Sequence, residues 1–310
     1  MTKKIYLLLG FFWTALAFAQ THTHQTQEVQ VGSLIHGTLL TPDQVEKPPL
    51  AIIIAGSGPT DRNGNQPMIQ NNSLKYLAEA LTNKGVATYR FDKRILTQMK
   101  AGTLREEDLS FDDFVTDVRN IVAHFKNEFS KIYLIGHSQG SLVGMLAAQE
   151  NVTGFVSISG PAQSIDQVLQ KQIGQQAPFL VEEMRVNFAK LRDNKPIEQV
   201  NPNLYSIFKP SVQNFMRSWM VYNPTEEIAK LHIPVLIISG ENDLQVPMAD
   251  GDLLYGANQN AEWVLISGMN HVLKIVSEAY GENIQSYNKT DLPISEDLVS
   301  EIIAFIQKQS

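Results

Sequence analysis

Short runs of mostly apolar residues recur along the chain, and they restrict its fold more than any other feature. Strands that are buried on both faces of a sheet have such continuous apolarity, whereas strands with one solvent-facing side alternate. Amphipathic helical patterns separate the runs, and this alternation predicts a mostly parallel sheet with helices on both faces. The predicted strands are Leu50–Ile54, Val86–Phe91, Ile132–Ile135, Phe155–Ile158, Val235–Ile238 and Trp263–Ile266, and the predicted helices include Ser73–Lys84, Ser110–Lys126 and a C-terminal one that carries Leu298, Val299, Ile302, Ile303 and Ile306.

Two regions depart from this rhythm. Near the N-terminus, Glu28–Val31 and Leu34–Leu40 flank a glycine-led turn, which predicts an antiparallel hairpin. Between Gly160 and Leu231 no strand is predicted, and helical stretches there indicate a helical cap over the sheet at about residues 161–231. The aromatic residues and methionines of this segment can attach the cap to the body or line an apolar pocket.

The first 19 residues have the pattern of a secretory signal peptide. Two lysines precede the apolar run Ile5–Ala19, which is short for a membrane span and ends in Ala17-Phe18-Ala19, an A-x-A cleavage pattern. We therefore expect cleavage after Ala19, in preference to an uncleaved anchor helix. The expected product is a periplasmic or extracellular protein without a stable membrane anchor.

Residues 20–27 are polar and aperiodic, which predicts a flexible tail before one domain at residues 28–310. His22 and His24 lie in this tail without the further ligands that a metal site requires, so no metal is expected. The 310-residue chain has no cysteine, which excludes disulfides and thiol chemistry. Its net charge of −7 argues against nucleic acid and anionic membranes as partners.

The sequence Gly136-His137-Ser138-Gln139-Gly140 matches the pattern G-x-S-x-G. The match alone is weak, but a predicted strand precedes it and a helical pattern, Ser141–Gln149, follows it. A serine on a tight strand-to-helix turn needs glycine on both sides because the neighbouring elements pack closely. The helix N-terminus also favours negative charge there. Ser138 is therefore the predicted nucleophile.

A serine hydroxyl needs a base to remove its proton. Among the seven histidines, only His271 is predicted to follow the C-terminal end of a strand, at the same sheet edge as Ser138. The orienting acid should follow another strand at that edge, where Glu241 and Asp243 both occur. Asp243 is preferred because it lies deeper in the loop; it would fix the tautomer of His271. The order Ser138, Asp243, His271 is that of α/β-hydrolases.

Acyl transfer also needs donors for the developing oxyanion. One is expected to be the backbone N–H of Gln139, directly after the nucleophile. The other is expected to be the N–H of Ser57, in the glycine-containing loop that follows Leu50–Ile54. Ser57 as the nucleophile is disfavoured because no helix-forming elbow follows it. Its Gly-Ser-Gly segment also lacks the Lys-Ser/Thr of a phosphate-binding loop, and no cofactor is expected.

Together these segments resemble the serine α/β-hydrolase superfamily, and within it the bacterial carboxylesterases whose oxyanion loop reads G-S-G-P-T-D-R-(D/N)-G-N. The resemblance covers nearly all of the chain after residue 19. It implies an α/β-hydrolase fold with a mostly parallel eight-stranded sheet, a helical cap and hydrolysis of short-chain acyl esters. Relatives have a Gly-x-Gly-x-Ser loop where this chain has Ile95-Leu96-Thr97-Gln98. The matching segments are Gly56–Asn65, Arg90–Arg94, Gly136–Gly140, Gly160–Ala162, Asp243–Pro247 and Gly268–His271.

The leading hypothesis is an exported serine carboxylesterase that cleaves a small-molecule ester through an acyl-enzyme on Ser138. The alternative keeps the triad in an aminopeptidase, since such sequences are also related to serine aminopeptidases of the proline-iminopeptidase type. That activity needs an acid for the substrate's α-amino group, and the cap offers Glu182, Glu183 and Glu198. A non-catalytic binding protein is a third hypothesis, disfavoured because the chain keeps all three expected triad residues.

Overall fold

Eight strands form one sheet in the computed structural model, which describes residues 24–43, 45–129, 131–148 and 151–309. The spatial order is β1-β2-β4-β3-β5-β6-β7-β8. Neighbours from β4 to β8 are parallel, while β2 pairs with both β1 and β4 in the antiparallel sense. The strands are β1 (His24–Val31), β2 (Ile35–Pro42), β3 (Leu50–Ile54), β4 (Ala87–Phe91), β5 (Ile132–His137), β6 (Gly154–Ile158), β7 (Val235–Gly240) and β8 (Glu262–Ile266).

Each of the six apolar runs coincides with a strand, and the predicted N-terminal hairpin is present, with its turn at Gly32 (φ 62°). One boundary prediction was wrong. β1 begins at His24, which pairs with Pro42, so residues 24–27 belong to the sheet and not to a tail. Their polarity fits an exposed edge strand, whose side chains and outward-facing backbone groups meet solvent. The expected signal peptide and residues 20–23 lie outside the described residues.

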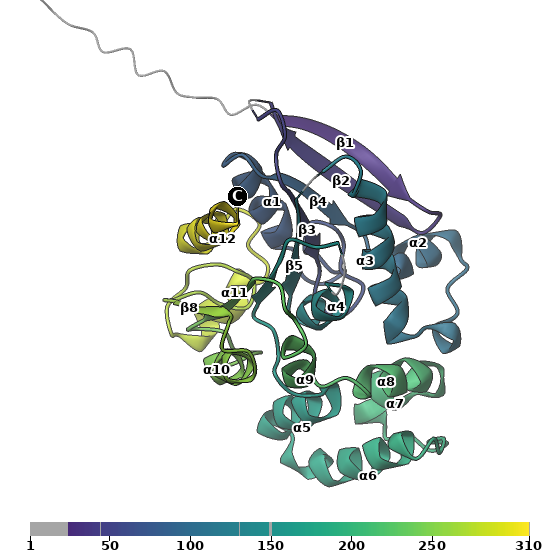
Figure 1. The fold of residues 1–310 in the computed structure, drawn as a ribbon. Coiled ribbons are helices and arrows are strands. Elements are labelled where there is room, and N and C mark those ends of the chain that lie inside the picture. The colour runs from purple at the N-terminus through teal and green to yellow at the C-terminus, as the bar shows by residue number, and fades with distance from the viewer. Residues whose placement is uncertain (1–23, 44, 130, 149–150, 310) are drawn as a thin grey trace, which may run out of the picture.

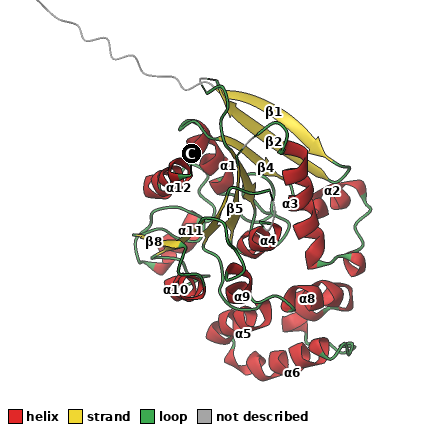
Figure 2. Ribbon diagram, in the orientation of Figure 1, coloured by secondary structure: helices red, strands yellow, loops and turns green. Residues whose placement is uncertain are grey.

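Helices cover both faces of the sheet (Figures 1 and 2). β3 shows the division: Leu50, Ile52 and Ile54 join one apolar cluster, and the alternate residues Ala51 and Ile53 join the other. The first cluster includes residues of α3 (Phe111–Phe125), α4 (Gln139–Ala147) and α10 (Met248–Ala257). The second includes residues of α1 (Ser73–Thr82) and α12 (Glu296–Lys308). This two-sided burial explains why the strands are continuously apolar, and it confirms the predicted α/β-hydrolase fold class.

The start of α3 follows from its sequence. Ser110 caps the helix, and its backbone N–H donates to the Asp113 carboxylate at 2.8 Å, which completes a capping box. The remaining helices of the body are α2 (Arg94–Ala101) and α11 (Tyr280–Ser286). Within the described part of the chain, none of the helices combines the length and apolar character needed to cross a membrane.

The segment between β6 and β7 contains helices and no strand among its described residues, as expected (Figure 1). Aromatic stacking fixes it to the body: the Trp219 ring lies 5.3 Å from the Phe111 ring and nearly parallel to it, and Phe215 packs against Phe114. Phe188 and Phe208 pack against each other inside the segment, while Phe179 and Tyr205 are exposed. Its helices are α5 (Ile165–Gln176), α6 (Val181–Arg192), α7 (Tyr205–Phe208), α8 (Gln213–Met220) and α9 (Pro224–Ile228).

Candidate active site

Ser138 occupies a strained turn between β5 and α4. Its backbone has φ 55° and ψ −121°, which is unusual for a residue with a side chain. The flanking glycines are required by space: a Cβ atom at Gly136 would lie 2.3 Å from the carbonyl oxygen of Gly140, and one at Gly140 would lie 2.3 Å from that of Ile54. The turn thus forces the Ser138 side chain out of the sheet edge, at the N-terminus of α4, as the motif predicted.

His271 and Asp243 meet at the same edge of the sheet. His271 Nδ1 lies 2.8 Å from Asp243 Oδ2, and both side chains are almost fully buried. Asp243 Oδ1 accepts the backbone N–H groups of Gln245 and Val246 at 2.8 and 2.9 Å. Burial alone would raise the pKa of Asp243, but the His271 ring and these backbone donors outweigh it and lower the pKa below its usual value. The aspartate is therefore held as an anion facing the imidazole.

Glu241, the other candidate acid, takes a different position. Its carboxylate accepts from Ser267 Oγ at 2.7 Å and from the backbone N–H of Gly268 at 3.0 Å. It supports the turn after β8 and does not contact His271 among the described hydrogen bonds. The geometry thus assigns the imidazole partner to Asp243.

The loop that carries His271 is built around a buried asparagine. Asn270 Oδ1 accepts the backbone N–H groups of Val272 and Lys274, and its amide donates to Ser286 Oγ on α11 at 2.7 Å. Leu273 adopts a positive φ of 65°, which is strained for a leucine. These contacts hold a compact loop from which His271 projects toward the elbow.

His137, next to the nucleophile, is a structural partner of this loop. Its Nε2 lies 2.8 Å from the backbone oxygen of His271, and the two rings are 4.8 Å apart. Burial, with the neighbouring His271, lowers the pKa of His137 to about 3, so the ring is neutral and Nε2–H donates to that carbonyl. The elbow and the His271 loop are thereby joined directly.

Ser138 and His271 line the same cavity of about 70 Å³, together with Ser57, Gln245 and Tyr287. No hydrogen bond joins Ser138 to His271 among those of the described residues. Such bonds are often long in free enzymes and shorten when substrate binds. The three predicted triad residues are therefore at one site, and two of them are already in contact.

The loop of residues 55–65, called the oxyanion loop here after its expected role, runs close to Ser138. A Cβ atom at Gly56 would lie 3.2 Å from Ser138 Cβ, so a side chain there would crowd the nucleophile. Thr60 Oγ1 donates to the Ser57 carbonyl at 2.8 Å, and Asp61 Oδ1 accepts from Asn63 N and Asn65 N. The polar residues of the motif thus fold the loop onto itself beside the elbow.

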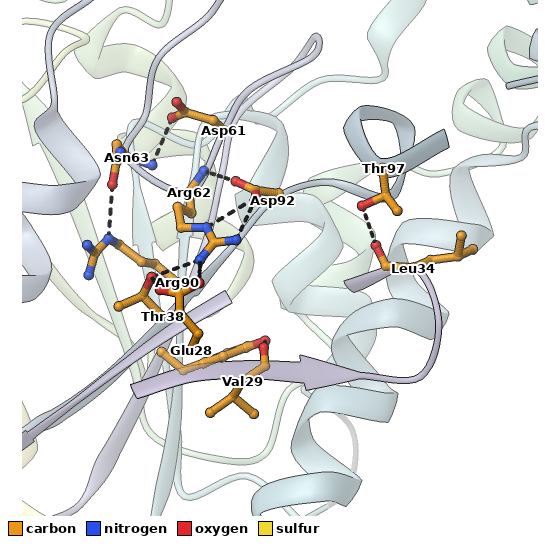
Figure 3. A network of polar contacts seen from close by, with 11 residues as sticks. Glu28, Val29, Leu34, Thr38, Asp61, Arg62, Asn63, Arg90, Asp92 and Thr97 are labelled. Carbon is orange, nitrogen blue, oxygen red and sulfur yellow. Dashed lines mark hydrogen bonds and ion pairs between the residues drawn. The ribbon is translucent and has the colours of Figure 1, made fainter. Parts of the chain in front are cut away.

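Arg62 fastens this loop to the antiparallel edge of the sheet (Figure 3). Its Nε and one terminal nitrogen donate to Asp92 Oδ2 at 3.1 and 2.7 Å, and its backbone N–H donates to Asp92 Oδ1. The other terminal nitrogen donates to Thr38 Oγ1 at 2.9 Å and also pairs with Glu28 of β1. Residues 56–65 and 90–94 therefore contact each other, although they are separate segments of the family resemblance in the sequence.

Lys93 reaches the same site from the strand β4 side. Its Nζ donates to the Gly56 carbonyl at 2.9 Å and to Gln139 Oε1 at 2.7 Å, and it lies 4.5 Å from the centre of the Phe114 ring. Burial lowers its pKa to about 7. Sequence reasoning did not single out this residue. The available signal was a lysine inside a matched segment, two residues after a fully buried strand.

A second, apolar cavity of about 330 Å³ adjoins the oxyanion loop. It includes Ser57 and Gln139, so it borders the two expected oxyanion donors. The segment with the atypical sequence 95–98 forms α2, which contributes Ile95 and Met99 to the wall. The other apolar lining side chains are Pro59, Leu104, Leu109, Phe114, Val212, Phe215 and Trp219.

The acids that could serve an aminopeptidase lie elsewhere. Glu182 is exposed and pairs with Arg185, Glu183 accepts from Asn201, and Glu198 is exposed. Of the described residues lining the two cavities, Glu106 is the only carboxylate, and it is paired with Lys209 at 2.6 Å. Within the described ranges no group of three or more His, Asp or Glu side chains could hold a metal ion.

The sheet order, the serine turn between β5 and α4 and the helical segment between β6 and β7 define an α/β-hydrolase. The sequence profile of the family described as serine aminopeptidase, S33, matches residues 70–275, which is more than half of the chain. The chain therefore belongs to this family. None of the curated proteins matches it in sequence.

Solved structures of hydrolases resemble the chain over most of its length. Est1E from Butyrivibrio proteoclasticus has a TM-score of 0.58 and 19% identity, with 92% of this chain and 98% of that chain covered. The Pyrococcus furiosus esterase Pf2001 has a TM-score of 0.55 and 16% identity, with 93% and 91% covered. A Mycobacterium tuberculosis puromycin-hydrolyzing peptidase has a TM-score of 0.54 and 14% identity, with 92% and 39% covered. At these identities the likeness concerns the fold alone.

Proposed function

We propose that the protein is an exported serine carboxylesterase, of the subgroup with the G-S-G-P-T-D-R-x-G-N oxyanion loop, and that it hydrolyses acyl esters through an acyl-enzyme on Ser138. One observation carries the proposal. Ser138, on the elbow, shares a cavity with His271, and the buried carboxylate of Asp243 lies 2.8 Å from the far nitrogen of that imidazole. A nucleophile, a base and an orienting acid are the three groups that a serine hydrolase uses in acyl transfer, and here they lie at one edge of the sheet.

In the proposed reaction Ser138 Oγ attacks the ester carbonyl while His271 Nε2 takes its proton. Asp243 keeps the Nδ1 proton in place and stabilises the imidazolium that forms. The N–H groups of Ser57 and Gln139 stabilise the negative oxygen of the tetrahedral intermediate. The imidazolium then gives its proton to the leaving alcohol. Water, activated by the same histidine, hydrolyses the acyl-enzyme.

The lining of the apolar cavity indicates which part of the substrate binds there. Its wall is mostly aliphatic and aromatic, and its one carboxylate, Glu106, is paired with Lys209. The other ionisable group of the wall, Lys93, already donates to the Gly56 carbonyl and to Gln139 Oε1. An uncharged acyl or alkyl group therefore fits there better than a charged one. A volume of about 330 Å³ exceeds what an acetyl group fills, so butyryl to octanoyl or aryl esters should react at least as well as acetyl esters. The Butyrivibrio esterase has a structure with ferulic acid bound, which is an aromatic acid.

A series of p-nitrophenyl esters from acetate to decanoate, hydrolysed by the wild type and by Ser138→Ala, tests the activity. We expect turnover in the wild type and a loss of on the order of 10⁴-fold or more in Ser138→Ala. Ser141→Ala, which removes a hydroxyl bonded to Ser157 one turn along α4, is the matched control and should remain active. Turnover that persists unchanged in Ser138→Ala contradicts the proposal.

Two further measurements separate this function from its alternatives. Labelling of Ser138 by a fluorophosphonate excludes a non-catalytic binding protein, since only an activated serine reacts. Aminoacyl-naphthylamides that are cleaved faster than the simple esters would make the protein a peptidase on the same triad. Export is tested by expressing the full chain and determining the N-terminus of the product: a start at Gln20 in the periplasm or medium supports it, and an intact Met1 in the membrane fraction contradicts it.

A further inference from the structure

We propose that Lys93 is a positioning residue of the oxyanion hole, which sets both expected donors through the hydrogen bonds of a single side chain. This inference rests on the proposed esterase function and deepens it. Lys93 also lines the apolar cavity, but its ammonium group acts through the two groups that would donate to the oxyanion.

The first bond fixes the Ser57 N–H. Lys93 Nζ donates to the Gly56 carbonyl at 2.9 Å, and this carbonyl and the Ser57 N–H belong to the same peptide unit. A trans peptide is planar, and its C=O and N–H point in opposite directions; no cis peptide occurs in the described residues. Holding the carbonyl toward Lys93 therefore aims the N–H away from it. Donation to the carbonyl also polarises the peptide and strengthens its N–H as a donor.

The second bond holds the residue that supplies the other donor. Lys93 Nζ donates to Gln139 Oε1 at 2.7 Å, and Gln139 is the first residue of α4, directly after Ser138. Gln139 is 4% exposed, so its amide oxygen has few other partners available. The ammonium group thus joins the oxyanion loop to the elbow. The distance between the Ser57 N–H and the Gln139 N–H therefore depends on the position of the Lys93 side chain.

The surroundings of Lys93 support this role over a general packing role. The ammonium lies over the Phe114 ring, and no carboxylate pairs with it among the described residues. The adjacent residues act differently: Asp92 binds Arg62 of the oxyanion loop, and Arg94 binds Asp113 and Asp117 of α3. Burial of an unpaired ammonium is costly unless its donors are used. Even as a neutral amine Lys93 keeps two N–H donors, enough for both bonds.

The test compares wild type, Lys93→Met and a matched control in ester hydrolysis. Methionine keeps the length and apolar stem of lysine but donates no hydrogen bond. Because an oxyanion forms only in the transition state, we expect kcat to fall about 10- to 100-fold with KM changed less than about 3-fold. Lys131→Met removes a lysine–carbonyl bond to Gln309 at the opposite end of β5 and should keep wild-type kcat.

A boronic acid, which forms a tetrahedral adduct with the serine, reports on the hole without turnover. Its affinity should fall in Lys93→Met by about the same factor as kcat, while the affinity for the carboxylate product stays near that of wild type. A general loss of structure would weaken both. Kcat within about 2-fold of wild type in Lys93→Met, or a uniform weakening of both ligands, overturns the inference.

Gln139→Ala keeps the test decisive if Lys93→Met does not fold. It retains the backbone N–H and removes only the side-chain acceptor, and we expect kcat to fall about 2- to 10-fold. Gln139→Glu retains an acceptor and should restore most of that loss. Unchanged kcat in Gln139→Ala, or no recovery in Gln139→Glu, overturns the inference. An inactive wild type would instead refute the esterase function itself, so the two failures are distinguishable.

Discussion

Replacing Asp243 with asparagine should reverse the tautomer of His271 while leaving the fold in place. Asp243 Oδ1 accepts two backbone N–H groups, from Gln245 and Val246, and Oδ2 faces His271 Nδ1. In Asp243→Asn the amide oxygen must take the position that accepts the two backbone donors. The amide NH₂ then faces Nδ1, which becomes an acceptor. The ring proton moves to Nε2, the atom that should receive the proton of Ser138.

The size of the effect follows from this geometry. An asparagine substitution of the same kind in a serine protease triad lowers kcat by about 10⁴-fold, which corresponds to about 5.4 kcal/mol in the activation free energy. We expect a similar loss because the orientation of the amide is fixed by two backbone donors. The free energy of unfolding should change by less than about 2 kcal/mol, since both donors keep their acceptor.

The assay is hydrolysis of p-nitrophenyl butyrate, together with urea unfolding to show that each variant is folded. Glu241→Gln is the matched control, because it also replaces a carboxylate by an amide in the same loop. Its contacts are with Ser267 and Gly268, so it should retain most of the activity. Full activity in Asp243→Asn combined with loss in Glu241→Gln would show that the orienting acid is Glu241 and refute this reasoning.

Three other expectations follow from contacts away from the reacting atoms. Arg62→Met should lower the free energy of unfolding by about 1–3 kcal/mol, because it leaves the partly buried Asp92 without its cation. The control Lys75→Met, at an exposed pair with Glu79, should lower it by less than about 0.5 kcal/mol. Urea unfolding compares the two variants, and equal effects would contradict the role of Arg62. His137 has a pKa of about 3 in the folded chain, below the usual value of about 6.5. As pH falls below 6.5, this histidine is therefore protonated in the unfolded chain but not in the folded one. The free energy of unfolding should then decline by up to about 1.4 kcal/mol per pH unit. His137→Gln keeps an N–H donor for the His271 carbonyl and should flatten that decline between pH 6.5 and 5 in urea titrations; an unchanged slope would argue against it. Met99→Trp should fill part of the apolar cavity and lower kcat/KM for octanoate esters at least about 10-fold more than for acetate; a uniform loss across the ester series would mean that the acyl group binds elsewhere.

The sheet could be predicted from sequence because burial on both faces leaves short runs that are apolar throughout. Leu50–Ile54 is apolar at every position, too short for a typical helix and rich in isoleucine, and its alternate residues enter different clusters in the structure. The start of β1 could not be predicted in this way. His24–Gln27 is polar because its partner lies on one side only, and the pairing that orders it is with distant Pro42–Leu39. Hydrogen bonding to a distant strand produces no recognisable pattern in the sequence of such a segment.

The positions of Ser138, Asp243 and His271 could be predicted from the rule that loops after parallel strands share an edge. The contacts of Lys93, Arg62 and His137 could not. They depend on side chains that reach between segments far apart in the chain, such as Arg62 and Asp92, which are 30 residues apart. Chain order and periodicity carry no information about such directions. The conformation of residues 95–98 was likewise not specified, and α2 forms there with Thr97 bonded to the Leu34 carbonyl (Figure 3).

The contacts of Arg62 with Glu28 of β1 and Thr38 of β2 affect how short a working enzyme of this type can be. A chain shortened to begin at Leu50 would keep every residue of the proposed triad and both oxyanion donors. It would lose Glu28 and Thr38, two of the three side chains that hold the Arg62 guanidinium. Asp92 would then be the one remaining side chain that holds the Arg62 guanidinium. The N-terminal hairpin, which contributes no atom to the proposed chemistry, thereby sets a lower limit on the catalytic unit, and minimised or permuted versions should retain it.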